Sequence, residues 1–85
     1  MSKRKLMPPI TQEEIRKLIE LQLGVRDVQD DDRLVEDLKA ESADVANLVA
    51  AAEEKYGIAI KESEIARLFT PADLFALVQK RLNGS

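Results

Sequence analysis

The sequence predicts an all-α fold: a four-helix bundle with a short third helix and a long loop between the first and second helices. Apolar residues recur at helical spacing in several segments of the 85-residue chain. Residues typical of helix caps open these segments, and Gly24 and Gly57 close two of them. The short alternating stretch at 58–60 has no second strand to pair with, so it is interpreted as an extended link.

The first helix is expected over about residues 12–24. Thr11, followed three residues later by Glu14, has the pattern of a capping box, in which each residue bonds the other's backbone N–H. Gly24 can adopt the left-handed conformation that ends a helix. The apolar stripe of this helix is formed by Ile15, Leu18 and Ile19 and broadened by Leu21 and Leu23.

Residues 25–39 are predicted to form a long loop, because their aspartates favour turns and caps over regular structure. Loops of this length are unusual in a small domain and are often functional. Five apolar residues are expected to attach the loop to the core: Val25, Val28, Leu34, Val35 and Leu38.

The second helix is expected to start near Ser42 and to end at Gly57. A short third helix is expected over about 62–68, where Ile65 and Leu68 are the apolar positions. The apolar stripe of the second helix comprises Val45, Leu48, Val49, Ala52 and Tyr56.

The last helix has the clearest start, with Thr70 as the cap, Pro71 at the first helical position and an acid, Asp73, three residues after the cap. Asn83 and Gly84 stop it. Its buried face is predicted to contain Leu74, Phe75, Val78 and Leu82. The domain therefore spans residues 11–82, between a flexible N-terminal tail (1–10) and a C-terminal tail (83–85).

Composition excludes several classes of function. The chain has no histidine and no cysteine, which argues against an enzyme, a disulfide framework and a thiolate metal site, and no metal site is expected. The aspartates of the loop lack the spacing of a calcium-binding EF-hand. No apolar run is long enough to span a membrane. A basic start without a following apolar segment is not a secretory signal and is too little for nucleic-acid binding. A cytoplasmic location is therefore expected, and a monomer is the default for so small and charged a domain.

The charges are uneven along the chain. Residues 27–64 contain four basic and twelve acidic side chains, a balance of −8, within a total of −3. Such a segment would repel nucleic acid and attract basic protein surfaces. Solvation of a small domain would account for the same acids.

Ser42 is the residue around which a functional pattern gathers. A first helix running into Leu23-Gly24-Val25, then 34–38 (Leu-Val-Glu-Asp-Leu), then an acid and Ser42 opening a helix, resembles the acyl carrier proteins. The resemblance covers residues 11–82. It implies that a pantetheinyl transferase attaches 4′-phosphopantetheine to Ser42. The arm would carry an acyl chain as a thioester to acyl-transferring or acyl-modifying enzymes of fatty acid, lipid or polyketide synthesis.

The resemblance also implies a surface that recognises partner enzymes with basic surfaces. Its residues would be Glu36, Asp37, Glu41, Ala43, Asp44, Glu53 and Glu54.

The chain departs from the family pattern around the serine. The family has Asp-Ser-Leu with a glycine three residues before the serine. This chain instead has Glu41 and Ala43 beside the serine and Lys39 at the glycine position. Alanines also replace bulkier residues in the second helix, which would allow either closer packing or a larger acyl-binding cavity: Ala46, Ala50, Ala51 and Ala52.

Two alternatives stay open. In the first, the chain is an unmodified helical interaction module, and Ser42 serves only as a helix N-cap, a role for which serine is among the best residues. In the second, the chain is an aminoacyl or peptidyl carrier, against which the acidic second helix argues mildly.

Overall fold

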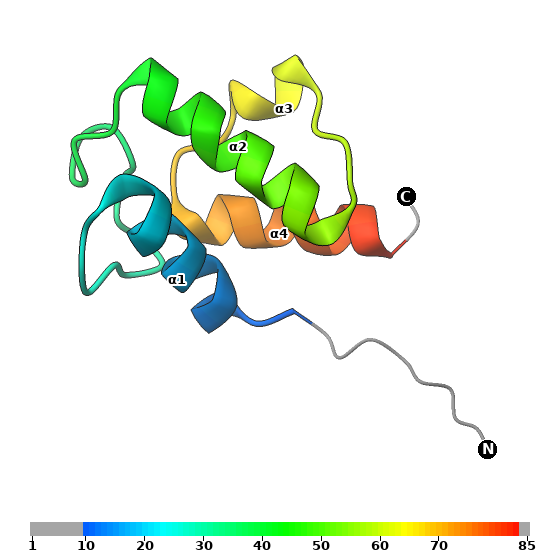
Figure 1. Ribbon diagram of the computed structural model, residues 1–85, viewed down its shortest axis with the longest axis horizontal. Coiled ribbons are helices and arrows are strands. Elements are labelled where there is room, and N and C mark those ends of the chain that lie inside the picture. Colours follow the sequence, from blue (N-terminus) through cyan, green and yellow to red (C-terminus); the bar gives the residue numbers. More distant parts are fainter. Residues whose placement is uncertain (1–9, 84–85) are drawn as a thin grey trace.

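The computed structural model describes residues 10–83, which contain four α-helices and no strand (Figure 1). This confirms the predicted all-α fold with a short third helix. Residues 1–9 and 84–85, which make up most of the predicted tails, lie outside the described residues. The helices are α1 (Gln12–Leu23), α2 (Ser42–Tyr56), α3 (Glu62–Ile65) and α4 (Pro71–Leu82).

The predicted caps account for most of the helix boundaries. The Thr11 hydroxyl accepts a hydrogen bond of 3.1 Å from the backbone N–H of Glu14. Gly24 ends α1 with φ 69° and Gly57 ends α2 with φ 66°, both left-handed. Thr70 caps α4 in the same way as Thr11 caps α1, by accepting from the backbone N–H three residues later.

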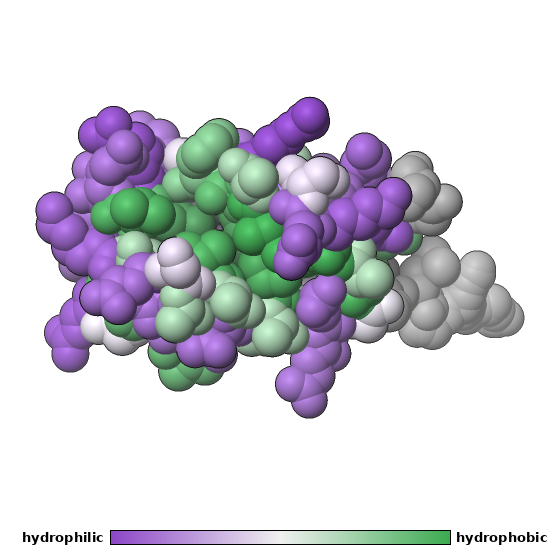
Figure 2. Space-filling view, turned by 90° about the horizontal axis from the view of Figure 1, so that it is seen from above, coloured by the Kyte–Doolittle hydropathy of each residue, from purple (hydrophilic) through white to green (hydrophobic). Residues whose placement is uncertain are grey.

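α1 packs against both α2 and α4, and α3 lies beside α2 at the top of Figure 1. Figure 2 looks down on that side, where apolar surface runs along the middle and hydrophilic side chains surround it. No helix in the described part of the chain is long and apolar enough to cross a membrane.

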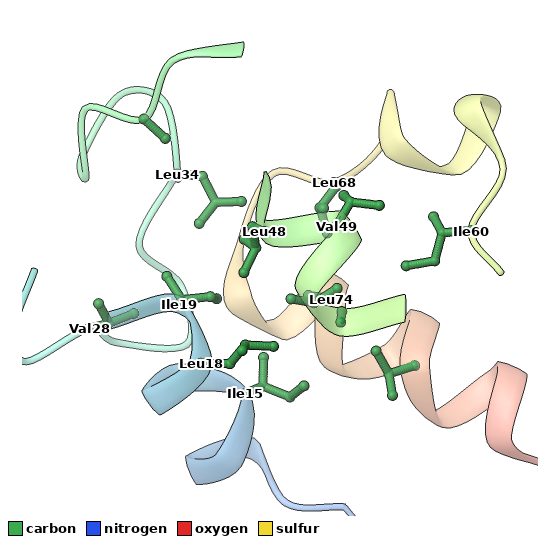
Figure 3. Close-up of a cluster of buried hydrophobic side chains, with 13 residues drawn as sticks. Ile15, Leu18, Ile19, Val28, Leu34, Leu48, Val49, Ile60, Leu68 and Leu74 are labelled. Atoms are coloured by element: carbon green, nitrogen blue, oxygen red, sulfur yellow. The ribbon is translucent and has the colours of Figure 1, made fainter. Parts of the chain in front are cut away.

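The core is built from aliphatic side chains of all three long helices and of the loop before α2 (Figure 3). Ile15 and Ile19 of α1, Leu48 of α2 and Leu74 of α4 are fully buried. Three apolar positions were predicted wrongly: Leu21, Val35 and Leu82 are 77%, 60% and 37% exposed.

The long loop before α2 is an ordered part of the fold. The side chains of Val28 and Leu34 are buried in the core. The Leu34 N–H donates to the Phe69 carbonyl at 2.8 Å, and the Arg16 guanidinium contacts the Asp30 carboxylate at 2.7 Å. These contacts hold the middle of the loop against α1 and against the segment that precedes α4.

The third helix is shorter than predicted. It ends at Ile65 rather than near 68, and turns lead from there to the buried side chain of Leu68. An ion pair between Glu64 and Arg81 joins it to α4, with the two side chains only 20% and 18% exposed. The Arg81 guanidinium, and then the backbone N–H of Lys61, lower the pKa of Glu64. This ion pair thus fixes the C-terminal half of the four-residue helix to the bundle.

Candidate functional site

Ser42 is the first residue of α2, and Glu41 is the N-cap, with φ −98° and ψ 171°. The backbone N–H of Glu41 donates to the Asp44 carboxylate at 2.9 Å. Asp44 therefore supplies the side-chain bond that secures this helix start. The interpretation of Ser42 as an ordinary N-cap is wrong, because Glu41 occupies that position.

The Ser42 side chain is exposed, and no hydrogen bond joins its hydroxyl to any other described residue. It stands at the end of a 15-residue helix whose first backbone N–H groups lack helical partners. Those groups and the helix dipole favour a negative charge at this point. A phosphodiester on the Ser42 oxygen would therefore meet a favourable electrostatic environment.

The backbone just before Ser42 is held in a specific shape. Lys39 has φ 63°, in the left-handed region that glycine adopts most easily. The next residue, Ala40, is 5% exposed, and its N–H donates to the Leu34 carbonyl at 2.8 Å. The turn at Lys39 thus returns the chain to the core and leaves Ser42 on the surface. Lys39 stands where the resemblance implies a glycine, and its left-handed φ is a physical reason for glycine at this position.

Ser42 lies on the edge of an open cleft of about 730 Å³ between α2 and α3. The cleft is the hollow in the apolar surface of Figure 2. Most of its lining is apolar, so it can receive an apolar group but gives little to a charged one. The lining residues are Val35, Ala40, Glu41, Ser42, Val45, Ala46, Glu62, Ile65, Ala66, Leu68 and Phe69.

The alanines of α2 contribute unequally to this cleft. Ala46 lines it, whereas Ala50 is exposed and Ala52 is fully buried in the core. The expectation of a larger cavity therefore rests on Ala46 alone. Ala52 belongs instead to the alternative that was weighed with it, closer helix packing.

The acidic residues near the serine fall into two groups. Glu36 and Asp37 pair with the Arg33 guanidinium at 3.6 and 3.2 Å. The backbone N–H of Arg33, and then its guanidinium, lower the pKa of Asp37. Glu41 and Glu54 are exposed and make no ion pair with another described residue. The second pair is therefore the more available to a partner.

Two of the acids expected to recognise partners have structural bonds. Asp44 is engaged at the start of α2, as described above. Glu53 accepts a part-buried bond of 2.8 Å from the backbone N–H of Ile60, which fixes the link between α2 and α3. Ala43 is exposed beside Ser42, as a contact residue would be.

Val35 and Phe69 are the site residues that sequence reasoning missed. Val35 was assigned to the core, and Phe69 was not assigned to the site at all, yet both line the cleft and are 60% and 63% exposed. No run of apolar spacing includes them, so only the folded arrangement brings them together. Within the described residues, no group of three or more His, Cys, Asp or Glu side chains could hold a metal ion.

Comparison with known proteins gives a consistent result. A family model described as "Phosphopantetheine attachment site" matches residues 13–78. An acyl carrier protein from Campylobacter hominis is 41% identical over 69 residues, which are 79% of this chain and 87% of that protein. An acyl carrier protein from Chlamydia trachomatis serovar D is 35% identical over 74 residues, 85% of this chain and 96% of that protein.

Solved structures agree. A putative acyl carrier protein from Mycobacterium tuberculosis has a TM-score of 0.72 at 26% identity, over 76% of this chain and 89% of that one. The acetyl actinorhodin acyl carrier protein from Streptomyces coelicolor has a TM-score of 0.70 at 26% identity, over 88% and 93% of the two chains. The span 13–78 matched by the family model includes two of the four serines, Ser42 and Ser63.

Proposed function

The chain belongs to the acyl carrier protein family, whose members hold a covalently attached 4′-phosphopantetheine, and we propose that Ser42 is the residue that bears this arm here. When bound, the arm supplies a terminal thiol that holds an acyl group as a thioester. The general role that follows from family membership is to carry acyl chains for fatty acid or polyketide synthesis.

One observation carries the assignment to Ser42. Its hydroxyl is exposed at the first position of α2, is free of the capping role, and borders an apolar cleft. The rest of the site supports the same reading, because the helix terminus favours a phosphate and the cleft can shelter an apolar chain. Ser63, the other serine in the matched span, lies within the four-residue α3 and borders no such cleft.

For the recognition of partner enzymes, we propose different roles for the residues that the resemblance implies. Glu41, Ala43 and Glu54 are exposed and make direct contacts with a basic partner surface in this proposal. Glu36 and Asp37 join them by exchanging Arg33 for a cation of the partner. Asp44 and Glu53 act indirectly, by fixing the start of α2 and the link to α3.

Members of this family carry groups rather than convert them, and we propose that the chain likewise leaves catalysis to its partners, among them a pantetheinyl transferase. A cytoplasmic location and a monomeric state stay predictions. Cell fractionation and light scattering of the purified protein test them.

The proposal is tested by incubating the unmodified protein with coenzyme A, magnesium and a pantetheinyl transferase, followed by intact-mass measurement. The transferase joins the Ser42 oxygen to the phosphorus of the arm, the pyrophosphate bond of coenzyme A breaks, and adenosine 3′,5′-bisphosphate leaves with the hydroxyl proton lost to the medium. We expect a single phosphopantetheine-sized increment on the wild-type chain and on Ser63→Ala, and none on Ser42→Ala.

An increment that persists in Ser42→Ala would contradict the assignment. No increment with any of several transferases would favour the unmodified interaction module. An aminoacyl or peptidyl carrier would also gain the arm, so loading the arm with acyl or aminoacyl groups separates that alternative.

A further inference from the structure

A second, smaller hollow lies between α3 and α4, outside the site described above. Its volume is about 190 Å³, and it shares only Leu68 with the lining of the cleft beside Ser42. The three lining residues from α4 follow one another at spacings of four and three, so they share one face of that helix. The lining residues are Glu64, Arg67, Leu68, Asp73, Leu77 and Lys80.

The two carboxylates of this hollow are bonded within the protein. Glu64 pairs with the Arg81 guanidinium and accepts a bond of 2.9 Å from the backbone N–H of Lys61. Asp73 accepts bonds of 2.9 and 3.0 Å from the backbone N–H groups of the two residues that precede α4. Internal donors therefore hold both negative charges, and the same bonds fix the two walls of the hollow relative to each other.

The two cations of the hollow, by contrast, are not bonded within the described part of the chain. Arg67 and Lys80 are exposed, and neither side chain makes a hydrogen bond or an ion pair with another described residue. The turn that contains Arg67 is ordered, since its backbone N–H donates to the Glu64 carbonyl at 3.1 Å. Two positive charges thus project from ordered backbone beside Leu68, which is buried, and Leu77, which is half-buried.

The hollow lies in a part of the chain whose charge is opposite in sign to that of the acidic middle. Residues 65–85 contain three basic side chains and one acidic side chain, a balance of +2, against −8 for residues 27–64. A single exposed cation is ordinary and contributes little to binding. Two cations beside one partly apolar hollow complement a chain segment that has both carboxylates and apolar side chains.

We propose that the hollow between α3 and α4 is a second docking site, which binds an acidic peptide segment of a partner protein. The partner's carboxylates pair with Arg67 and Lys80, and an apolar side chain between them covers Leu77. Nucleic acid is disfavoured because the acidic middle of the chain repels it. A second copy of the chain is disfavoured as well, since each copy has a net charge of −3 and a contact between unlike faces does not close into a dimer.

A partner bound at this site leaves Ser42 accessible. Ser42 does not line the hollow, and the one residue that the two linings share is the buried Leu68. The protein can therefore hold an acidic partner at α4 while a basic partner approaches α2. The inference goes beyond the proposed function and does not depend on modification of Ser42.

The test uses a fluorescein-labelled hexapeptide in which glutamate and leucine alternate, titrated with the protein at low ionic strength and followed by fluorescence anisotropy. Arg67→Gln and Lys80→Gln should each weaken binding about two- to fivefold, as the loss of one exposed ion pair does. The double variant should weaken it further, and added salt should weaken binding to the wild type. A peptide of alternating glutamate and serine should bind less tightly, because it lacks the apolar contact.

Lys17→Gln is the matched control, because Lys17 is an exposed lysine of α1 that does not line the hollow. It should bind the peptide as the wild type does, and so should Lys80→Arg, which keeps the charge. NMR locates the peptide independently of affinity. The backbone amide signals of Arg67, Leu77 and Lys80 should shift as the peptide is added, whereas that of Glu54 should not.

Equal weakening by Lys17→Gln would show attraction to total charge alone and would overturn the proposal. Unchanged affinity in the double variant, or amide shifts confined to other parts of the chain, would overturn it too. Self-association without peptide that Lys80→Gln abolishes, measured by analytical ultracentrifugation, would make a second copy the occupant and would also contradict it. None of these measurements uses the arm, so their outcome is separate from that of the proposed function.

Discussion

At the scale of single residues, the turn before Ser42 contains a conformational cost. Lys39 adopts φ 63°, and the left-handed conformation costs a residue with a side chain about 1–2 kcal/mol more than the right-handed one. The buried side chain of Ala40 and its bond to Leu34 stabilise the turn in spite of this cost. The position that carries the proposed arm is therefore reached through a strained residue rather than a flexible one.

Lys39→Gly should consequently stabilise the protein. The relief of strain exceeds the greater flexibility of glycine in the unfolded chain, so we expect a gain of about 0.5–1 kcal/mol in the free energy of unfolding. Urea unfolding measures it. Lys61→Gly is the control, since Lys61 has an ordinary extended conformation with φ −81°. A Lys39→Gly protein less stable than the wild type would contradict this account of the turn.

Truncation of Asp44 should destabilise the protein, whereas truncation of Ser42 should leave its stability nearly unchanged. Asp44→Ala removes the acceptor of the Glu41 N–H and should cost about 1 kcal/mol, as the loss of a helix cap does. Ser42→Ala should change stability by less than about 0.5 kcal/mol, because the hydroxyl has no partner among the described residues. Thermal unfolding distinguishes them, and a cost of a full cap for Ser42→Ala would restore the view of Ser42 as a structural residue.

At the scale of elements, α3, which lines the cleft with Ser42, is the helix least able to be stable by itself. α3 has four residues, too few to be stable alone. The Glu53–Ile60 bond fixes the link that leads to it, and the Glu64–Arg81 ion pair joins it to α4. The shape of the cleft therefore depends on a few polar contacts outside the core.

Glu53→Ala should destabilise the protein by about 1–2 kcal/mol, because the partly buried Ile60 N–H loses its acceptor. Hydrogen exchange should speed up at Ile60 in particular. Glu54→Ala removes the neighbouring, exposed carboxylate and should leave both properties as in the wild type. Matching effects of the two variants would show that Glu53 is a surface acid like Glu54.

The Glu64–Arg81 pair predicts a pH dependence of stability. Because the pKa of Glu64 is lowered in the folded state, its contribution is complete above the ordinary glutamate pKa and is lost as the pH falls through the lowered value. Glu64→Gln should therefore be less stable than the wild type near neutral pH, with the difference closing below about pH 4. Urea unfolding at several pH values measures this, with Glu62→Gln as a control on the same helix. A difference that persists unchanged in acid would exclude the ion pair as its cause.

The sequence predicts features that depend on local interactions and misses features that depend on contacts between distant residues. Gly24, Gly57 and Thr70 act within a few residues of themselves, and the helix ends they predicted are present. Leu21 is expected to broaden the apolar stripe of the first helix and Val35 to attach the loop to the core, but the folded chain exposes both. Their exposure depends on how separate elements pack, which periodicity does not encode.

The site shows the same limit. The flanks of Ser42 were sufficient to suggest the family, and the acids near it to suggest a recognition surface. The hydrogen bonds that Asp44 accepts from the Glu41 N–H and Glu53 accepts from the Ile60 N–H were not predicted. They depend on side-chain rotamers and, for Glu53, on the path of the link between α2 and α3. The segment that holds Phe69 at the cleft is bonded to the loop through the Leu34 N–H and the Phe69 carbonyl, a contact between residues far apart in the chain.

At the scale of the whole molecule, a small bundle carries a strongly acidic middle and has an open apolar cleft beside Ser42. The aliphatic core and the ordered loop serve to hold that serine at a helix terminus, accessible from outside. In the proposed function the acids steer basic partners toward this face, and that effect should weaken as salt is added. If Ser42 bears the arm, as proposed, the ordered loop and the core hold its point of attachment in a fixed position.

The most direct test of this arrangement is to locate the modification on the wild-type chain by tandem mass spectrometry after transferase treatment. Trypsin cleaves after Lys39, Lys55, Lys61 and Arg67, so Ser42 and Ser63 fall in separate peptides, 40–55 and 62–67. We predict the phosphopantetheine increment on peptide 40–55, with fragments assigning it to Ser42. An increment on peptide 62–67, or a peptide 40–55 that stays unmodified while the intact protein gains the mass, would contradict the account.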